Sequence, residues 1–197
     1  MATRLLATPN DGVLILTLES DDGFPRLERR VLGELRREIE GLAARGFSGC
    51  VITGSKTAFA AGAEIGELAR LTPGQAHEFS REGQAAFRAI ERSSRRVVAA
   101  IRGYCFGGGL DLALACHLRI ATDDALFAHP GGSLGILTGW GGTQRLARLI
   151  GRSRAMEMFV TGRRLGAHEA QECGLISRTA PAHELLAIAA RFSRAVA

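Results

Sequence analysis

The chain has 197 residues, enough for one domain with a sizeable hydrophobic core. Hydrophobic residues make up 46% and the mean hydropathy is +0.08, which excludes a disordered chain and favours a globular protein in water. The net charge is +5, but the arginines are spread along predicted helices beside acidic residues and are not interleaved with aromatic ones. This pattern is typical of solvated helix faces, so we expect no nucleic-acid partner.

The apolar runs are far shorter than a membrane span, and the N-terminal residues lack the apolar region of a signal peptide. We therefore expect a cytoplasmic protein with no membrane partner. The cysteines form no C-x-x-C pair and have no metal-ligand spacing, which predicts buried free thiols and no metal site. They are Cys50, Cys105, Cys116 and Cys173.

The first part of the chain predicts a β-α-β unit. Residues 13–18 are apolar and form a strand, and residues 21–25 form a turn. A helix is expected from residue 26 to about 45, because its apolar residues recur every three or four positions. A second strand covers residues 50–53. A crossover of this kind implies that the two strands are parallel.

The remaining elements continue the alternation. Residues 59–65 form a loop of small residues that enters a short helix, and Thr72, Pro73 and Gln75 form a capping box that opens a long helix. The alternation of strands and helices predicts a single α/β domain over residues 1–197. Further strands are expected at 97–101, 117–121 and 125–128, and further helices at 110–116, 143–150, 153–160, 167–173 and 183–196.

The junction after the strand at 97–101 is the first candidate site. A glycine-rich loop, residues 103–109, leads directly into an apolar helix. Glycines allow a ligand to approach the backbone closely, and unpaired N–H groups at a helix start stabilise a developing negative oxygen. Asp111 follows in the first helical turn, where it is a candidate acid or base. The small-residue loop offers a second backbone donor, Ala61, by the same reasoning.

Other motif matches lack their structural context. Ser133 stands in a G-x-S-x-G match, but the glycine-rich residues that follow are unsuited to the helix that a nucleophile elbow needs. The segment around Lys56 lacks the adjacent glycine and lysine of a P-loop, and there is no G-x-G-x-x-G. A serine hydrolase stays open as an alternative, and no nucleotide cofactor is expected.

Three segments together resemble the enoyl-CoA hydratase/isomerase (crotonase) superfamily. They are ITGSKTAFAAGAEI, IRGYCFGGGLDLALACHLRIA and the stretch from LFAHPGGSLGILTGWGGTQR to CGLI. The resemblance implies a spiral of β-β-α repeats around an acyl-CoA pocket, assembled as a homotrimer or a dimer of trimers. The chain ends before the C-terminal helical extension that is usual in this superfamily, so we expect that extension to be lacking.

The resemblance also implies roles for named residues. The matches FAAGAEI and FGGGLDL place the two oxyanion-hole donors on Ala61 and Gly108, with Asp111 as the catalytic acid or base. The segment Ala61, Gly62, Ala63 and Glu64 resembles the stretch that grips the adenine end of CoA. Trp140 either walls the acyl pocket or fills core or surface space.

The most informative departure is Gly131, where hydratases of the superfamily carry a second catalytic carboxylate. Hydration needs both a general base and a general acid. His129 is one substitute, a bound bicarbonate is another (as in the naphthoyl-CoA synthase branch), and chemistry that needs one carboxylate is a third. The predicted function is acyl-CoA chemistry through a thioester enolate; the alternatives are isomerase, decarboxylase or thioester hydrolase activity, or CoA binding without catalysis. No cofactor other than the substrate's own CoA is expected.

Overall fold

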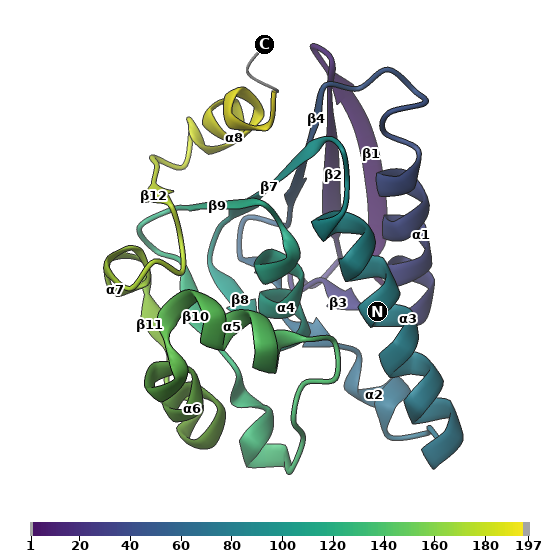
Figure 1. Cartoon of the computed structure of the whole chain (residues 1–197), viewed down its shortest axis with the longest axis vertical. Helices are drawn as coiled ribbons and strands as arrows, with labels where there is room; N and C mark the ends of the chain where they lie inside the picture. The colour runs from purple at the N-terminus through teal and green to yellow at the C-terminus, as the bar shows by residue number, and fades with distance from the viewer. Residues whose placement is uncertain (1, 195–197) are drawn as a thin grey trace.

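The computed structural model describes residues 2–194 and has the expected α/β architecture (Figure 1). A twisted sheet of six strands has the order β1-β2-β4-β7-β9-β12. Strands β1 and β2 are antiparallel, and every other neighbouring pair in this sheet is parallel. The strands are β1 (Arg4–Asn10), β2 (Val13–Glu19), β4 (Gly49–Thr53), β7 (Arg96–Ile101), β9 (Leu118–Ala121) and β12 (Arg178–Thr179).

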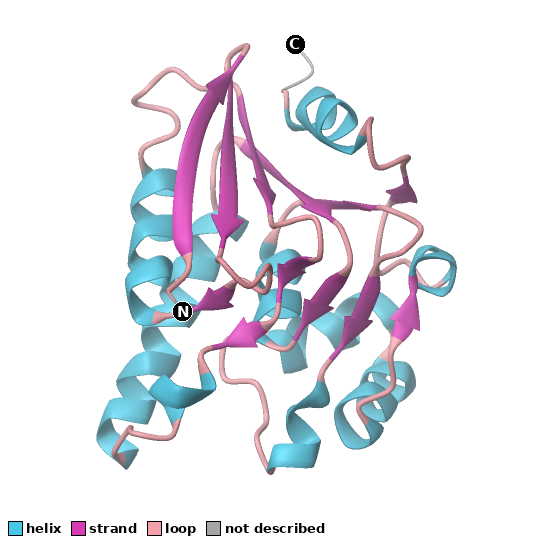
Figure 2. Ribbon diagram, turned by 180° about the vertical axis from the view of Figure 1, so that it is seen from behind, coloured by secondary structure: helices cyan, strands magenta, loops and turns pink. Residues whose placement is uncertain are grey.

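Two smaller sheets lie below the large one (Figure 2). One has the order β11-β10-β8-β5 and the other pairs β3 with β6. Their strands have only two or three residues each, so these sheets serve to fix loops in place. The strands are β11 (Leu165–Gly166), β10 (Leu126–Ala128), β8 (Tyr104–Phe106), β5 (Ala58–Ala60), β3 (Arg26–Leu27) and β6 (Gly62–Ala63).

The predicted β-α-β unit is confirmed, because β2 pairs in parallel with β4 across helix α1. The helix itself is shorter than predicted: α1 covers Arg29–Glu40 rather than residues 26–45. Arg26 and Leu27 pair instead with β6, and the Arg26 N–H donates to the Thr3 hydroxyl at 2.7 Å. These partners are distant in the sequence, so helical periodicity alone could not exclude residues 26–28.

The other helices follow the predicted order. Helix α3 (Pro73–Glu91) begins with the predicted capping box, in which Thr72 and Gln75 bond reciprocally. Helix α4 (Gly108–Ala115) begins two residues earlier than predicted and is buried on all sides. The last predicted helix starts at Leu185 and ends at Ser193, and residues 195–197 lie outside the described part. That last helix is α8 (Leu185–Ser193). The remaining helices are α2 (Ile65–Leu68), α5 (Gly142–Ile150), α6 (Arg152–Thr161) and α7 (Ala167–Glu172).

Both faces of the large sheet are buried from β2 to β9, whereas the edge strand β1 is mostly exposed. One face packs in a large apolar cluster with α1, α3 and α4, and the other face packs against α8. Parallel sheets covered on both faces are typical of α/β proteins. All four cysteines are free, and three of them are buried, as predicted. Within residues 2–194, none of the helices is both long enough and apolar enough to cross a membrane.

Candidate functional site

A cavity of about 270 Å³ lies where helix α4 begins. Four segments distant in the sequence line it: residues 61–63, 107–108, 129–132 and 136–140. Side chains of α2, α3 and α6 close its sides. The lining is mostly apolar with few polar groups, as is usual for small-molecule sites.

Backbone geometry forms the floor of this cavity. Gly107 has φ +51°, a conformation that favours glycine, and turns the chain from β8 into α4. The Gly107 N–H donates to the Ala128 carbonyl at 2.9 Å. Gly108 follows as the first residue of α4, where the helix leaves N–H groups without intrahelical partners. A Cβ at Gly108 would lie 3.3 Å from the Ala63 backbone nitrogen, so these two backbones are neighbours.

The structure places Ala61 differently from our expectation. Its N–H donates to the Pro25 carbonyl at 2.8 Å, so this donor already has a partner. Ala61, Gly62 and Ala63 all line the cavity, as expected for ligand-contacting residues. Glu64 does not, because its carboxylate accepts from the Gly66 N–H at 3.0 Å and caps helix α2. The backbone nitrogen beside Gly108 is that of Ala63, two residues after the predicted donor.

Asp111 is completely buried one turn into α4. The Thr138 hydroxyl donates to its Oδ2, and its Oδ1 lies 3.5 Å from His129 Nε2. Burial raises the pKa of Asp111 from its ordinary 3.8 to about 7. The Thr138 hydroxyl, the Arg145 guanidinium and the backbone at the start of α5 oppose this rise without cancelling it. A carboxyl group with this pKa can both accept and donate a proton near neutral pH.

His129 is also buried, immediately after strand β10. Burial lowers its pKa to about 4, so the imidazole is neutral at physiological pH. Its ring packs against Phe159, with the ring centroids 4.6 Å apart. The sequence suggested His129 only as one substitute for a missing acid, and the structure brings it to Asp111.

Gly131 lines the cavity in a 3₁₀ helix that spans Pro130–Leu134. A Cβ at this position would lie 2.6 Å from the Ile136 carbonyl oxygen, which is far inside van der Waals contact. The Gly131 carbonyl accepts from the Ile136 N–H at 2.9 Å, which fixes this arrangement. A side chain at residue 131 would therefore require the loop to move.

Trp140 lines the cavity and is almost fully buried. Its indole packs edge-on against Phe79 and Phe87, with centroid distances of 5.2 and 5.7 Å. A Cβ at Gly83 or at Gly108 would overlap the indole, so the ring is wedged between α3 and the start of α4. Trp140 thus belongs both to the cavity wall and to the core. Sequence analysis gave no signal for Gly83 or for Thr138.

Two other features lack the geometry of this site. Ser133 is exposed in the 3₁₀ helix and donates to the Pro130 carbonyl at 2.8 Å, so it does not form the strand-to-helix elbow of a serine hydrolase.

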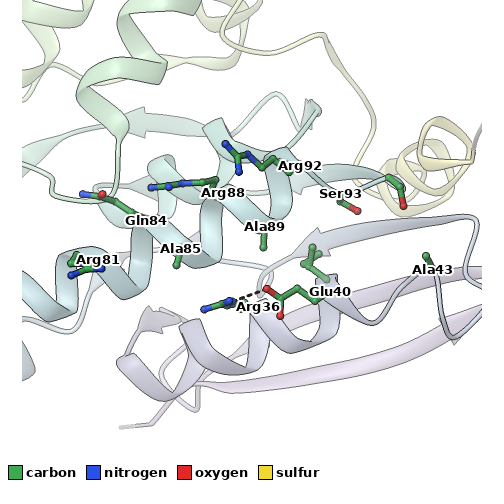
Figure 3. Close-up of a pocket in the computed structure, with 12 residues that line it drawn as sticks. Arg36, Glu40, Ala43, Arg81, Gln84, Ala85, Arg88, Ala89, Arg92 and Ser93 are labelled. Carbon is green, nitrogen blue, oxygen red and sulfur yellow. Dashed lines mark hydrogen bonds and ion pairs between the residues drawn. The ribbon is translucent and has the colours of Figure 1, made fainter.

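A more open groove of about 620 Å³ lies between α1 and α3 (Figure 3). Four arginines are among its lining residues, with Arg36 paired to Glu40, and none of the predicted site residues lines it. Residues 2–194 contain no cluster of three His, Cys, Asp or Glu side chains suited to a metal ion.

Known proteins share both sequence and fold with this chain. The profile of the enoyl-CoA hydratase/isomerase family matches residues 9–197. The chain belongs to this family. Over 183 residues it is 39% identical to the Mycobacterium bovis protein named "Probable enoyl-CoA hydratase", a match covering 92% of this chain and 70% of that protein. Over 185 residues it is 41% identical to the fatty acid oxidation complex subunit alpha of Shewanella loihica, covering 90% of this chain and 26% of that one.

Solved structures give the same result for the fold of this hydratase/isomerase family member. The enoyl-CoA hydratase of Bacillus anthracis superimposes with a TM-score of 0.89 at 33% identity, covering 96% of this chain and 74% of that one. DspI of Pseudomonas aeruginosa superimposes with a TM-score of 0.91 at 31% identity, covering 96% and 72%. The crotonase-like fold and membership of an enzyme family, both expected from the sequence, are confirmed.

Proposed function

We propose that this protein transforms acyl-CoA thioesters, in the manner of an enoyl-CoA hydratase or isomerase, through a thioester enolate. One observation carries this proposal: a buried carboxyl group with a pKa of about 7 lies one helical turn after a backbone donor that lines an apolar cavity. The donor is Gly108 and the carboxyl group is that of Asp111. This combination matches the two needs of enolate chemistry, which are charge stabilisation at oxygen and proton transfer at carbon.

The N–H of Gly108 is the first donor to the thioester oxygen in this proposal. Its location at the N-terminus of α4 adds the helix dipole to the hydrogen bond. The Ala63 backbone nitrogen supports a second donor better than that of Ala61, because Ala61 already bonds to Pro25. Loss of one such donor reduces turnover about 10²–10³-fold in other enzymes.

Asp111 stores the proton that the reaction moves. Its carboxyl group fits against the first residue of α5, because Gly142 has no side chain there and a Cβ would overlap Asp111 Oδ1. The absence of a carboxylate at Gly131 leaves the wild-type site with one buried carboxyl group, unless an anion such as bicarbonate supplies a second. The acyl chain would lie among the apolar side chains of the cavity, beside Trp140.

The test is turnover of crotonyl-CoA, followed by loss of the enoyl absorbance, with and without added bicarbonate. We expect turnover by the wild-type chain, and a loss of about 10²–10⁴-fold in Asp111→Asn because the proton store is removed. Dependence on bicarbonate would place an anion near Gly131. A panel of 3-enoyl, dienoyl and malonyl-type thioesters covers isomerase, decarboxylase and hydrolase chemistry. Thioester binding without turnover of any member would contradict the proposal and indicate a CoA-binding protein.

A further inference from the structure

The proton stored on Asp111 has no direct path to the cavity. Asp111 is fully buried and does not contribute to the cavity lining, whereas His129 and Thr138 both do. A group that contacts the reacting atoms must reach them at hydrogen-bond distance or through one water molecule. One of the residues between Asp111 and the cavity must therefore carry the proton.

Two buried atoms that make no hydrogen bond of ordinary geometry lie close together at this place. They are Asp111 Oδ1 and His129 Nε2, which lie 3.5 Å apart. Buried polar atoms are normally hydrogen-bonded, so an unpartnered pair needs an explanation. One shared proton satisfies both atoms once they approach by about 0.5 Å to ordinary hydrogen-bond length. The other carboxylate oxygen, Oδ2, already accepts from the Thr138 hydroxyl.

The imidazole is held in position for this exchange. Phe159 packs against one side of its ring, and the preceding strand β10 pairs in parallel with β8, which leads into α4. The Thr138 hydroxyl holds the carboxylate through its other oxygen, Oδ2. Gly131 contributes no acid to the cavity because it has no side chain, and a Cβ there would lie 2.6 Å from the Ile136 carbonyl oxygen.

We infer that His129 and Asp111 form a proton relay in which His129 is the catalytic residue and Asp111 is its positioning and proton-storing partner. The inference rests on the proposed function. Nε2 faces the carboxylate, which leaves Nδ1 as the ring nitrogen that can act on a ligand. The relay supplies base and acid in turn, so it needs no second carboxylate.

For addition of water to a 2-enoyl thioester, the steps balance as follows. Asp111 begins ionised and His129 carries its proton on Nε2. Nδ1 takes a proton from water while the water oxygen bonds to the β-carbon, and the Nε2 proton passes to Asp111 Oδ1. The alkene electron pair moves to the α-carbon and the thioester oxygen, where the Gly108 N–H stabilises it. Nδ1 then protonates the α-carbon, the Asp111 proton returns to Nε2, and one water has been added.

The surroundings support a relay in which the imidazole stays uncharged and passes its proton to the Asp111 carboxylate. Burial disfavours both the ionised carboxyl and the protonated imidazole, and accordingly the pKa of Asp111 is raised and that of His129 is lowered. Arg145 on α5 is the cation that acts on Asp111, and Cys105 on β8 is the nearby thiol, whose own pKa is raised well above its usual range. The active base form needs ionised Asp111, so kcat/KM should rise with pH through about 7.

The test compares His129→Gln with the wild-type chain and with a matched control, His77→Gln, whose histidine is exposed on α3. We expect the His129 variant to lose turnover about 10²–10⁴-fold while its thioester binding stays within a few-fold. The control should keep wild-type turnover. In His129→Ala, added imidazole should restore part of the activity, which a merely structural role would not allow.

A readout independent of turnover is the ¹⁵N NMR titration of the His129 ring. We expect its nitrogen shifts to follow the ionisation of Asp111 near pH 7 and to lose this transition in Asp111→Asn. Turnover of His129→Gln within a few-fold of wild type, with the same pH profile, would overturn the relay alone. Failure of the wild-type chain on every thioester would overturn the proposed function, and the relay with it.

Discussion

At the residue scale, the burial of Asp111 has two effects. It raises the pKa of the carboxyl group to near neutral pH, and it destabilises the fold when the group is ionised. The carboxyl group is fully buried, and its hydrogen bond to Thr138 only partly opposes the loss of hydration. The raised pKa means that the folded chain holds the Asp111 proton more tightly than the unfolded chain does. Between pH 3.8 and about 7, this residue therefore makes the free energy of unfolding fall as pH rises.

Asp111→Asn should consequently stabilise the protein at pH 8. Asparagine keeps an oxygen that accepts from Thr138 but has no charge to bury, so the free energy of unfolding should increase by about 1–4 kcal/mol at that pH. The gain should shrink as pH falls towards 4, where the wild-type carboxyl group is neutral. Urea denaturation at pH 5 and pH 8 measures both values.

The matched control for this experiment is Asp22→Asn. The Ser20 hydroxyl, the Phe24 N–H and the Arg26 guanidinium hold the pKa of Asp22 well below its usual range. This substitution should therefore destabilise the protein at pH 8, which is the opposite sign. Equal effects of the two substitutions would show that Asp111 is not held with a raised pKa.

At the element scale, the features predicted correctly from the sequence are those that depend on short-range patterns. The capping box at Thr72 and the parallel pairing of β2 with β4 needed only short-range motifs and one crossover rule. Strands β5, β6 and β8 were predicted as loops, because a strand of two or three residues has no recognisable periodicity. Strand β1 is mostly exposed and contains Pro9, so it too gave no hydrophobic signal.

The same limit applied to the site. Gly108 and Asp111 lie in one glycine-rich junction, so both could be named as candidates from the sequence. The partner of the Ala61 N–H is Pro25, and the partner of the Asp111 carboxylate is Thr138; both pairings depend on tertiary packing. The sequence could therefore name the segments of the site but not the hydrogen bonds that decide which atoms are free.

The contact between α3 and Trp140 gives a prediction at this scale. A Cβ at Gly83 would overlap the indole, so Gly83→Ala should displace Trp140 and destabilise the fold by about 1–3 kcal/mol. Trp140 is the single tryptophan, so its fluorescence emission should shift in this variant. Gly74→Ala on the same helix meets no neighbour within 4 Å and should be neutral or stabilising by up to about 1 kcal/mol. Unchanged fluorescence and stability in Gly83→Ala would contradict the close packing of Trp140 between α3 and the start of α4.

At the scale of the whole molecule, the large sheet divides the protein into two layers. Alternate residues of β2, β4 and β7 face the α1, α3 and α4 layer that carries the site. Val13, Val51, Val98 and their neighbours face the opposite way and pack under α8. The backbone of α8 also comes close to β4, since a Cβ at Gly49 would overlap the Ser193 carbonyl. Helix α8 thus covers a sheet face that would otherwise be apolar and exposed.

Two adjacent leucines of α8 allow a test of this covering role, because one is buried against the sheet cluster and the other is exposed. Leu185 is 1% exposed within the second apolar cluster, whereas Leu186 is 42% exposed. We expect Leu185→Ala to lower the free energy of unfolding by about 2–5 kcal/mol, and Leu186→Ala to change it by less than about 1 kcal/mol. Because the layer with the candidate site lies on the other side of the sheet, turnover per folded molecule should be unchanged in both variants. Chemical denaturation measures the difference, and an equal loss in both variants would mean that the outer face of α8 is itself covered by a contact between chains.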